Sequence, residues 1–245
     1  MSVVEYVLLF GAVLVGGYLG LRAPGLQRQH LHLVLTVSGA YLLSITAMHL
    51  LPEAFSATSS GQVGNSEVQP GWALLVGFFI QLLLEQFSEG VEHGHIHAHA
   101  GHSALPVLIG LSVHALLEGS PLVVAGEAVH AGHEHNHLLW GVVLHKIPAG
   151  FALSVLLFQA GYRRGVIVML MVVFASMSPL GALLSERFLP AEAVPYLLAA
   201  VSGSLLHVST TILFELDEPH HHRFSWRKAF AMMAGIGAAL LTAYV

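Results

Sequence analysis

The sequence contains no cysteine, and charged residues make up only 9% of its 245 residues. The absence of cysteine excludes disulfide bonds and thiolate metal sites, so any bound metal must be held by histidine, carboxylate, hydroxyl, thioether or water ligands. Soluble domains contain about 25% charged residues, so the scarcity of charge excludes an ordinary soluble fold. Hydrophobic residues make up 55% of the chain, and the mean hydropathy is +0.73. The chain is therefore expected to be an integral membrane protein.

Eight hydrophobic stretches are each long enough to cross a bilayer as a helix of about 20 residues. They lack the apolar and polar alternation over about ten residues that is typical of membrane β-strands. The predicted fold is therefore all-α, with eight transmembrane helices in a single domain over residues 1–245. The spans are expected near residues 3–21, 32–52, 71–90, 104–126, 138–159, 165–185, 193–214 and 227–245.

Basic residues are concentrated on one side of this predicted bundle. With eight spans, the loops after spans one, three, five and seven lie on the same side, which the positive-inside rule assigns to the cytoplasm. Both termini are therefore expected to be extracytoplasmic. The basic residues on the cytoplasmic side are Arg22, Arg28, Arg163, Arg164, Arg223, Arg227 and Lys228.

Two predicted spans carry ionisable residues near the middle of the bilayer: His114 with Glu118, and His145 with Lys146. Such groups cost several kcal/mol in hydrocarbon unless they pair, face a cavity or bind a cation. His114 and Glu118 are four residues apart, so they project from the same face of a helix and can bind one cation. Imidazole with carboxylate suits zinc and its first-row neighbours. A single histidine could instead bond a neighbouring helix, but four ionisable residues in adjacent spans favour a cation site.

Other ionisable residues near the ends of spans are secondary candidates for metal access or release. His49 and Glu53 lie four residues apart at the outer end of the second span, and Pro52 between them is expected to end or kink the helix. An outer metal site and a capping or interfacial role both suit this pair. Glu215, at the cytoplasmic end of the seventh span, could guide a released cation or be a solvated helix end. His207 is expected to form an interhelical hydrogen bond.

Two histidine-rich tracts lie between the spans. One is predicted in a cytoplasmic loop near 91–103, and the other lies in an outer loop near 127–137. Histidine alternating with glycine and alanine makes a flexible tract that can bind metal in many geometries without forming a rigid site. The candidate ligands of the cytoplasmic tract are His93, His95, His97 and His99.

Four short motifs occur in order along the spans: HLLPEA at 49–54, H-x-x-x-E-G at 114–119, H-K-x-P-A at 145–149 and S-x-S-P-x-G at 176–181. This series resembles the ZIP family of divalent metal transporters over the whole chain. The resemblance implies eight helices with outward termini and import of zinc, or of iron, manganese or cadmium, into the cytoplasm. It also implies a pathway lined by the fourth and fifth helices.

By the same resemblance, His114, Glu118 and His145 are the metal ligands of the transport site. Zinc would then be a transported substrate, with no catalytic cofactor, and the protein would not be an enzyme. Its partners would be metal ions and the lipid bilayer of a plasma or inner membrane, without nucleic acid; a homodimer is left open.

The sequence departs from many ZIP relatives, which hold a second metal ion beside the first. The positions that would supply its ligands are Ala115, Lys146 and Ala149, so the chain is similar to the subset with H-K-x-P-A. A single metal is expected, with the Lys146 ammonium in the region of the second cation and paired with Glu118. The alternative is that Lys146 extends to the outer surface.

Two other functions place histidine and carboxylate inside a membrane. An intramembrane zinc hydrolase is one, but no H-E-x-x-H motif lies within a predicted span; the one match, at residues 133–137, falls in the predicted outer loop. A metal sensor that binds zinc without moving it is the other.

Overall fold

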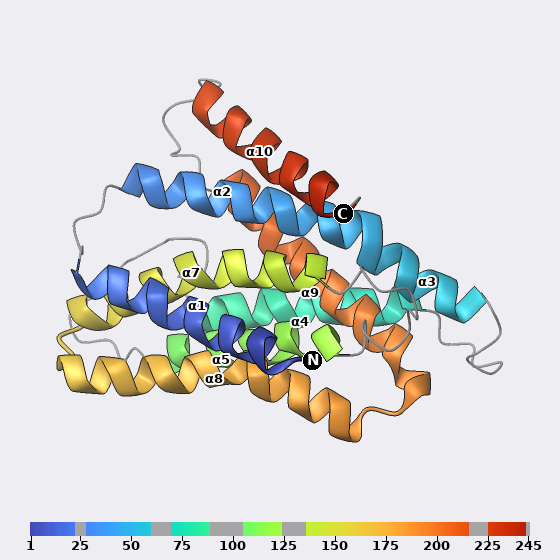
Figure 1. Ribbon diagram of the computed structural model, residues 1–245, viewed down its shortest axis with the longest axis horizontal. Helices are drawn as coiled ribbons and strands as arrows, with labels where there is room; N and C mark the ends of the chain where they lie inside the picture. The colour runs from blue at the N-terminus through green and yellow to red at the C-terminus, as the bar shows by residue number, and fades with distance from the viewer. Residues whose placement is uncertain (23–27, 60–69, 89–104, 124–135, 216–224, 244–245) are drawn as a thin grey trace.

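The computed structural model describes residues 1–22, 28–59, 70–88, 105–123, 136–215 and 225–243, and within these ranges all regular structure is helical (Figure 1). The all-α prediction is therefore confirmed for the described residues. The elements are α1 (Val3–Arg22), α2 (Arg28–Ile45), the π-helix η1 (Thr46–Leu50), α3 (Leu51–Ser59), α4 (Pro70–Ser88), α5 (Leu105–Gly119), α7 (Asn136–Gln159), α8 (Arg164–Phe188), the 3-10 turn η3 (Ala191–Ala193), α9 (Val194–Glu215) and α10 (Trp226–Ala243).

Seven helical segments of the described chain are long and apolar enough to cross a membrane, which makes the chain a multi-pass integral membrane protein. They correspond to the first seven predicted spans. The eighth predicted span, 227–245, is present as α10 but is not one of the seven. Its first turn contains Arg227 and Lys228, which shorten the apolar part of the helix.

The second span bends near Pro52 and does not end there. Of the two alternatives, an end or a kink, the structure has the kink: α3 continues from α2 through η1 as far as Ser59, with a change of direction that is visible in Figure 1. Proline has no N–H, and its ring clashes with the carbonyl group four residues earlier, here that of Met48. The chain widens its turn just before this point: the N–H of Leu51 donates to the carbonyl oxygen of Thr46, five residues back.

Glycine residues allow three pairs of helices to approach closely. A Cβ atom added to any of these glycines would lie within 3.0 Å of a backbone carbonyl oxygen on the partner helix, closer than real Cβ atoms come. Small residues at such contacts are typical of membrane helices, where close backbone packing replaces the hydrophobic effect as the source of association. The reciprocal contacts are Gly16 with Gly150 for α1 and α7, Gly119 with Gly181 for α5 and α8, and Gly77 with Gly203 for α4 and α9.

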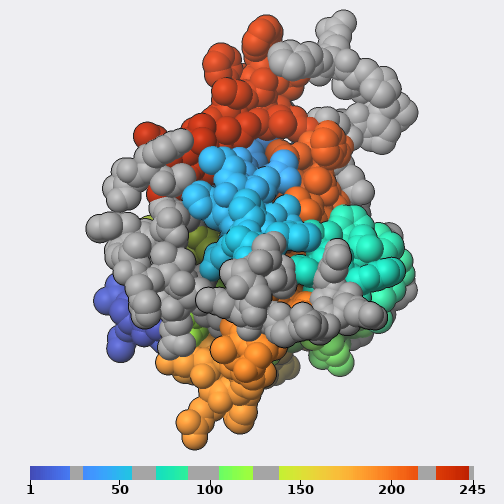
Figure 2. Space-filling view, turned by 90° about the vertical axis from the view of Figure 1, so that its right-hand side faces the viewer, coloured from blue at the N-terminus to red at the C-terminus, as the bar shows by residue number. Residues whose placement is uncertain are grey.

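The helices that carry the ionisable motifs are among the most enclosed. In α7, 83% of the apolar window is buried inside the protein, and in α5 with the turn after it 67% is buried, against 17% for α4. Figure 2 views one end of the bundle, where α3 (light blue) lies between α10 (red), α4 (teal) and α8 (orange). Helix α3 therefore lies toward this end, whereas His114 and Glu118 of α5 and His145 and Lys146 of α7 are buried inside the bundle.

Candidate metal centre

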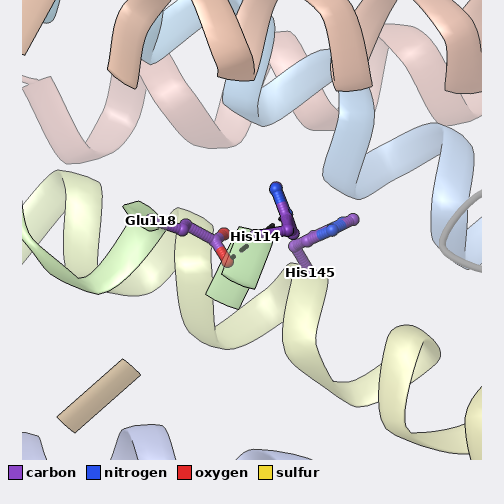
Figure 3. A group of neighbouring side chains, drawn as sticks. All are labelled: His114, Glu118 and His145. Carbon is purple, nitrogen blue, oxygen red and sulfur yellow. Dashed lines mark ion pairs between the residues drawn. The ribbon is translucent and has the colours of Figure 1, made fainter. Parts of the chain in front are cut away.

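His114, Glu118 and His145 form a buried cluster between α5 and α7. Figure 3 shows the imidazole rings and the carboxylate gathered together, and one ligand atom from each residue lies within 4.8 Å of the others. The three residues are 3%, 2% and 1% exposed. The structure thus brings together the three residues that were predicted from the sequence as primary ligands. Their role as ligands stays a prediction.

The geometry within the cluster leaves ligand atoms available. Nε2 of His114 lies 3.7 Å from Oε2 of Glu118, and the two imidazole rings meet edge to face with centroids 6.1 Å apart. No hydrogen-bond partner among the described residues reaches Nε2 of His114 or Oε1 of Glu118. Because buried polar atoms are normally hydrogen-bonded, two such atoms within one cluster fit a site that receives a cation.

Binding of zinc would require the cluster to contract. Ligand atoms sit at about 2.0–2.2 Å from a tetrahedral zinc ion and therefore about 3.3 Å from one another. From a separation of up to 4.8 Å, the side chains would have to approach by up to about 1.5 Å. Rotamer adjustments of the three side chains can supply a movement of this size.

Lys146 completes the charge balance of the cluster. Its ammonium group donates a hydrogen bond of 2.7 Å to Oε2 of Glu118, and Lys146 is 2% exposed. Nζ also lies 5.7 Å from the centroid of the Phe174 ring on α8. The alternative in which Lys146 extends to the outer surface is wrong, and the predicted pairing with Glu118 is confirmed.

Helix α8 packs against α5 next to this cluster. The hydroxyl group of Ser178 donates to the carbonyl oxygen of Ala115 at 2.9 Å, while Gly119 lies against the backbone of Ser178. Gly181 lies against the backbone of Leu116 in the same way. The S-x-S-P-x-G motif therefore contributes close backbone contacts at Leu116 and Gly119 and one interhelical hydrogen bond at Ala115.

Residues 98–243, more than half of the chain, match the sequence model of the family described as ZIP zinc transporter. The chain belongs to the ZIP family. It is 30% identical over 162 residues to zinc transporter ZIP9-B of Xenopus laevis, covering 60% of this chain and 52% of that protein. It is 29% identical over 227 residues to zinc transporter ZIP9 of Micropogonias undulatus, covering 73% of this chain and 71% of the relative.

A third relative, zinc transporter ZIP9 of Xenopus tropicalis, is 29% identical over 171 residues, which cover 63% of this chain and 55% of the relative. The alignments thus span about half the length of two of these proteins. The names of the family and of the relatives are those of transporters and not of enzymes, which agrees with the motif series of the sequence.

Of the secondary candidates, Lys146 contacts the cluster of this ZIP protein through Glu118. His49, in η1, and Glu53, in α3, are half-buried and do not belong to the three-residue group. Glu215 is the last residue of α9, and its side chain is outside the described part of the structure. The loop candidates His93, His95, His97 and His99 also lie outside the described residues.

The prediction for His207 is confirmed, because its Nε2 pairs with Oε2 of Glu85 and joins α9 to α4. Sequence reasoning missed two other polar residues of the same helices, Gln81 of α4 and Ser204 of α9, which meet beside His114. A signal was present in the sequence, since Gln81 and Glu85 interrupt an apolar stretch at a spacing of four residues and so share one face of α4.

Proposed function

We propose that this ZIP protein transports zinc into the cytoplasm through a site formed by His114, Glu118 and His145. The observation that carries the proposal is the convergence of three buried ligand atoms within 4.8 Å between two membrane-spanning helices. Membership of a family described as zinc transporters, and relatives that carry the same name, support zinc as the substrate. Histidine and carboxylate ligands also accept other first-row dications, so iron and manganese are expected to compete with zinc, as is cadmium.

The proposed topology has eight transmembrane helices, with α10 as the eighth and both termini outside the cytoplasm. The packing of α10 supports its inclusion: Gly235 lies against the backbone of Val37 on α2, and Tyr41 is hydrogen-bonded to Thr242 at 3.0 Å. An even number of crossings brings the two ends to the same side. The excess of basic residues in the loops on the opposite side assigns that side to the cytoplasm.

The proposed site holds one metal ion. Ala115 and Ala149 offer no side-chain ligand atoms, and Lys146 carries a positive charge beside Glu118. A second dication near this ammonium would be repelled by several kcal/mol at an effective dielectric constant of about 20.

Lys146 then acts as a counter-ion that alternates with the metal. In the empty site its ammonium group neutralises Glu118, since an unpaired carboxylate buried between helices would be costly. An arriving zinc ion takes over the carboxylate, and the ammonium pairs with it again when zinc leaves. This exchange weakens binding and favours release.

Transport into liposomes tests the proposal. Purified protein is expected to move zinc, and His114→Ala, Glu118→Ala and His145→Ala are each expected to abolish saturable flux while the protein still folds. Matched controls are His30→Ala and Glu192→Ala, which alter exposed residues of the same types. Normal flux in the Glu118→Ala protein would contradict the assignment.

The same preparation distinguishes transport from the two alternative functions, a metal sensor and an intramembrane hydrolase. Zinc binding without flux would indicate a sensor, and turnover of lipid or peptide would indicate a hydrolase. Zinc flux without turnover supports transport.

A further inference from the structure

Gln81 is a buried amide in the apolar helix α4. It is 0% exposed, although α4 is the span with the smallest buried fraction. An amide removed from water costs free energy unless its polar atoms are hydrogen-bonded, so a glutamine at this position needs specific partners. Its partners come from two other helices and include a residue of the proposed metal site.

The side-chain oxygen of Gln81 contacts two donors. Oε1 lies 2.8 Å from Nδ1 of His114 on α5, and it accepts a hydrogen bond of 2.9 Å from the hydroxyl group of Ser204 on α9. An amide oxygen has two lone pairs and no hydrogen, so it can only accept. With the amide in this orientation, Nδ1 of His114 carries the proton of this hydrogen bond.

This bond determines which nitrogen of His114 is available to a metal. A neutral imidazole carries one proton, so a proton on Nδ1 leaves the lone pair on Nε2. Nε2 is the atom that lies 3.7 Å from Oε2 of Glu118 and that no described residue reaches by a hydrogen bond. The lone pair is thus on the ring nitrogen that lies near the carboxylate with which it would share a cation.

We propose that Gln81 is a positioning residue that holds His114 in the Nδ1–H tautomer and presents Nε2 to the transported metal. The assignment of His114 as a ligand rests on the proposed function. Histidine ligands of metals commonly donate their second ring N–H to an oxygen acceptor, which fixes the ring and its tautomer. Gln81 supplies this acceptor without adding a second negative charge beside Glu118, and the Ser204 hydroxyl donates to the same oxygen.

If the amide of Gln81 were turned by about 180°, the other tautomer of His114 would be expected. With its NH₂ group toward His114, Gln81 would donate to Nδ1, and the proton of the imidazole would be on Nε2, facing Glu118. The tautomer of His114 therefore decides between the two arrangements.

Nitrogen-15 spectra of histidine-labelled, metal-free protein measure this tautomer directly, with His114→Gln used to assign the resonances of His114. The wild-type protein is expected to show a protonated Nδ1 and an unprotonated Nε2. Gln81→Asn keeps an amide but is one methylene shorter, and it is expected to give a mixture of tautomers. A proton on Nε2 in the wild type, or an unchanged tautomer in Gln81→Asn, would overturn the proposal.

Zinc titration provides the second readout. Gln81→Asn and Gln81→Leu are expected to weaken zinc binding about 10–100-fold, the range found when such supporting residues are removed. Gln81→Glu keeps an oxygen acceptor and is expected to retain the Nδ1–H tautomer and bind zinc at least as tightly as the wild type. The matched control is Gln86→Leu, at an exposed position of the same helix, with unchanged affinity expected.

Affinity within twofold of the wild type in Gln81→Leu would also overturn the proposal, and so would weaker binding in Gln81→Glu. The tautomer is measured without metal, so this result is separate from the transport assay. If the tautomer and affinity behave as expected but liposomes take up no zinc, the transport proposal fails and the role of Gln81 stands.

Discussion

The ammonium nitrogen of Lys146 lies 2.7 Å from Oε2 of Glu118, and both side chains are almost completely buried. The same carboxylate oxygen is 3.7 Å from Nε2 of His114, so a lysine and a candidate metal ligand share one atom of Glu118. A cation that binds Glu118 here must compete with an internal positive charge. The strength of metal binding and the number of metal ions both depend on that competition.

Removal of the Lys146 ammonium is expected to strengthen zinc binding and slow turnover. In Lys146→Ala the carboxylate of Glu118 has lost its counter-ion, so the empty site becomes less favourable relative to the zinc-bound site. The zinc affinity is measured by titration in a background without the loop histidines. Lys228→Ala serves as the control, because it removes a lysine outside the site. Weaker zinc binding in Lys146→Ala would contradict the competition.

Metal stoichiometry is a separate prediction for the unmodified site. One zinc ion is expected, since Ala115 and Ala149 provide no ligand atoms and Lys146 repels a second dication. Anomalous scattering from crystals of the zinc-bound protein counts the metal ions. Two well-occupied positions between α5 and α7 would refute the single-metal site.

Gly119→Ala is expected to destabilise the protein and disrupt the site. A Cβ atom at Gly119 would collide with the backbone of Ser178, so α5 and α8 would have to separate beside Glu118. Overpacking of this kind typically costs about 1–3 kcal/mol. Thermal unfolding in detergent is expected to show a lower midpoint, accompanied by weaker zinc binding.

The matched control for that variant is Gly11→Ala on α1, where an added Cβ would have no neighbour within 4 Å. Alanine favours a helix over glycine by about 1 kcal/mol, so Gly11→Ala is expected to be neutral or slightly stabilising. An equal loss of stability in the two variants would show that the close packing of α5 on α8 does not cause the loss in Gly119→Ala.

The helices could be predicted from the sequence because the length of an apolar run is a local property. The first seven spans agree with the structure within a few residues, apart from the second. That span continues past Pro52 because the backbone forms a π-turn at Thr46–Leu50, and apolar length alone does not indicate this turn. The position of α10 was also predictable, although its first-turn basic residues leave it outside the seven membrane-spanning candidates.

The candidate site was predictable only in part. The spacing of His114 and Glu118 places them on one face of a helix whatever the rest of the fold is. The contact of Gln81 with His114, in contrast, joins residues 33 positions apart on separate helices and depends on how α4 packs against α5. A single glutamine in an apolar span indicates a polar partner but does not identify that partner.

The pair of His207 with Glu85 is expected to stabilise the packing of α9 on α4. A double-mutant cycle with His207→Ala and Glu85→Ala is expected to give a coupling energy of about 1 kcal/mol, within the range for interhelical hydrogen bonds in membranes. Thermal unfolding of the four proteins measures it, with zinc affinity as a second readout. A coupling energy of zero would mean that the contact contributes nothing to stability.

The histidine-rich tract near 91–103 is expected to be dispensable for saturable zinc flux. The three ligand atoms of the proposed site come from α5 and α7, so the site is formed without the loop. A sequence in which histidine alternates with glycine and alanine can bind metal in many geometries and need not line the path. Replacement of its histidines by serine should therefore leave the maximal flux nearly unchanged in liposomes, with less zinc retained per protein in a binding assay.

His114→Ala in the same background provides the comparison, since it removes a ligand of the site and should abolish flux. Complete loss of flux on replacing only the tract would place it within the transport pathway. The replaced residues are His93, His95, His97, His99 and His102.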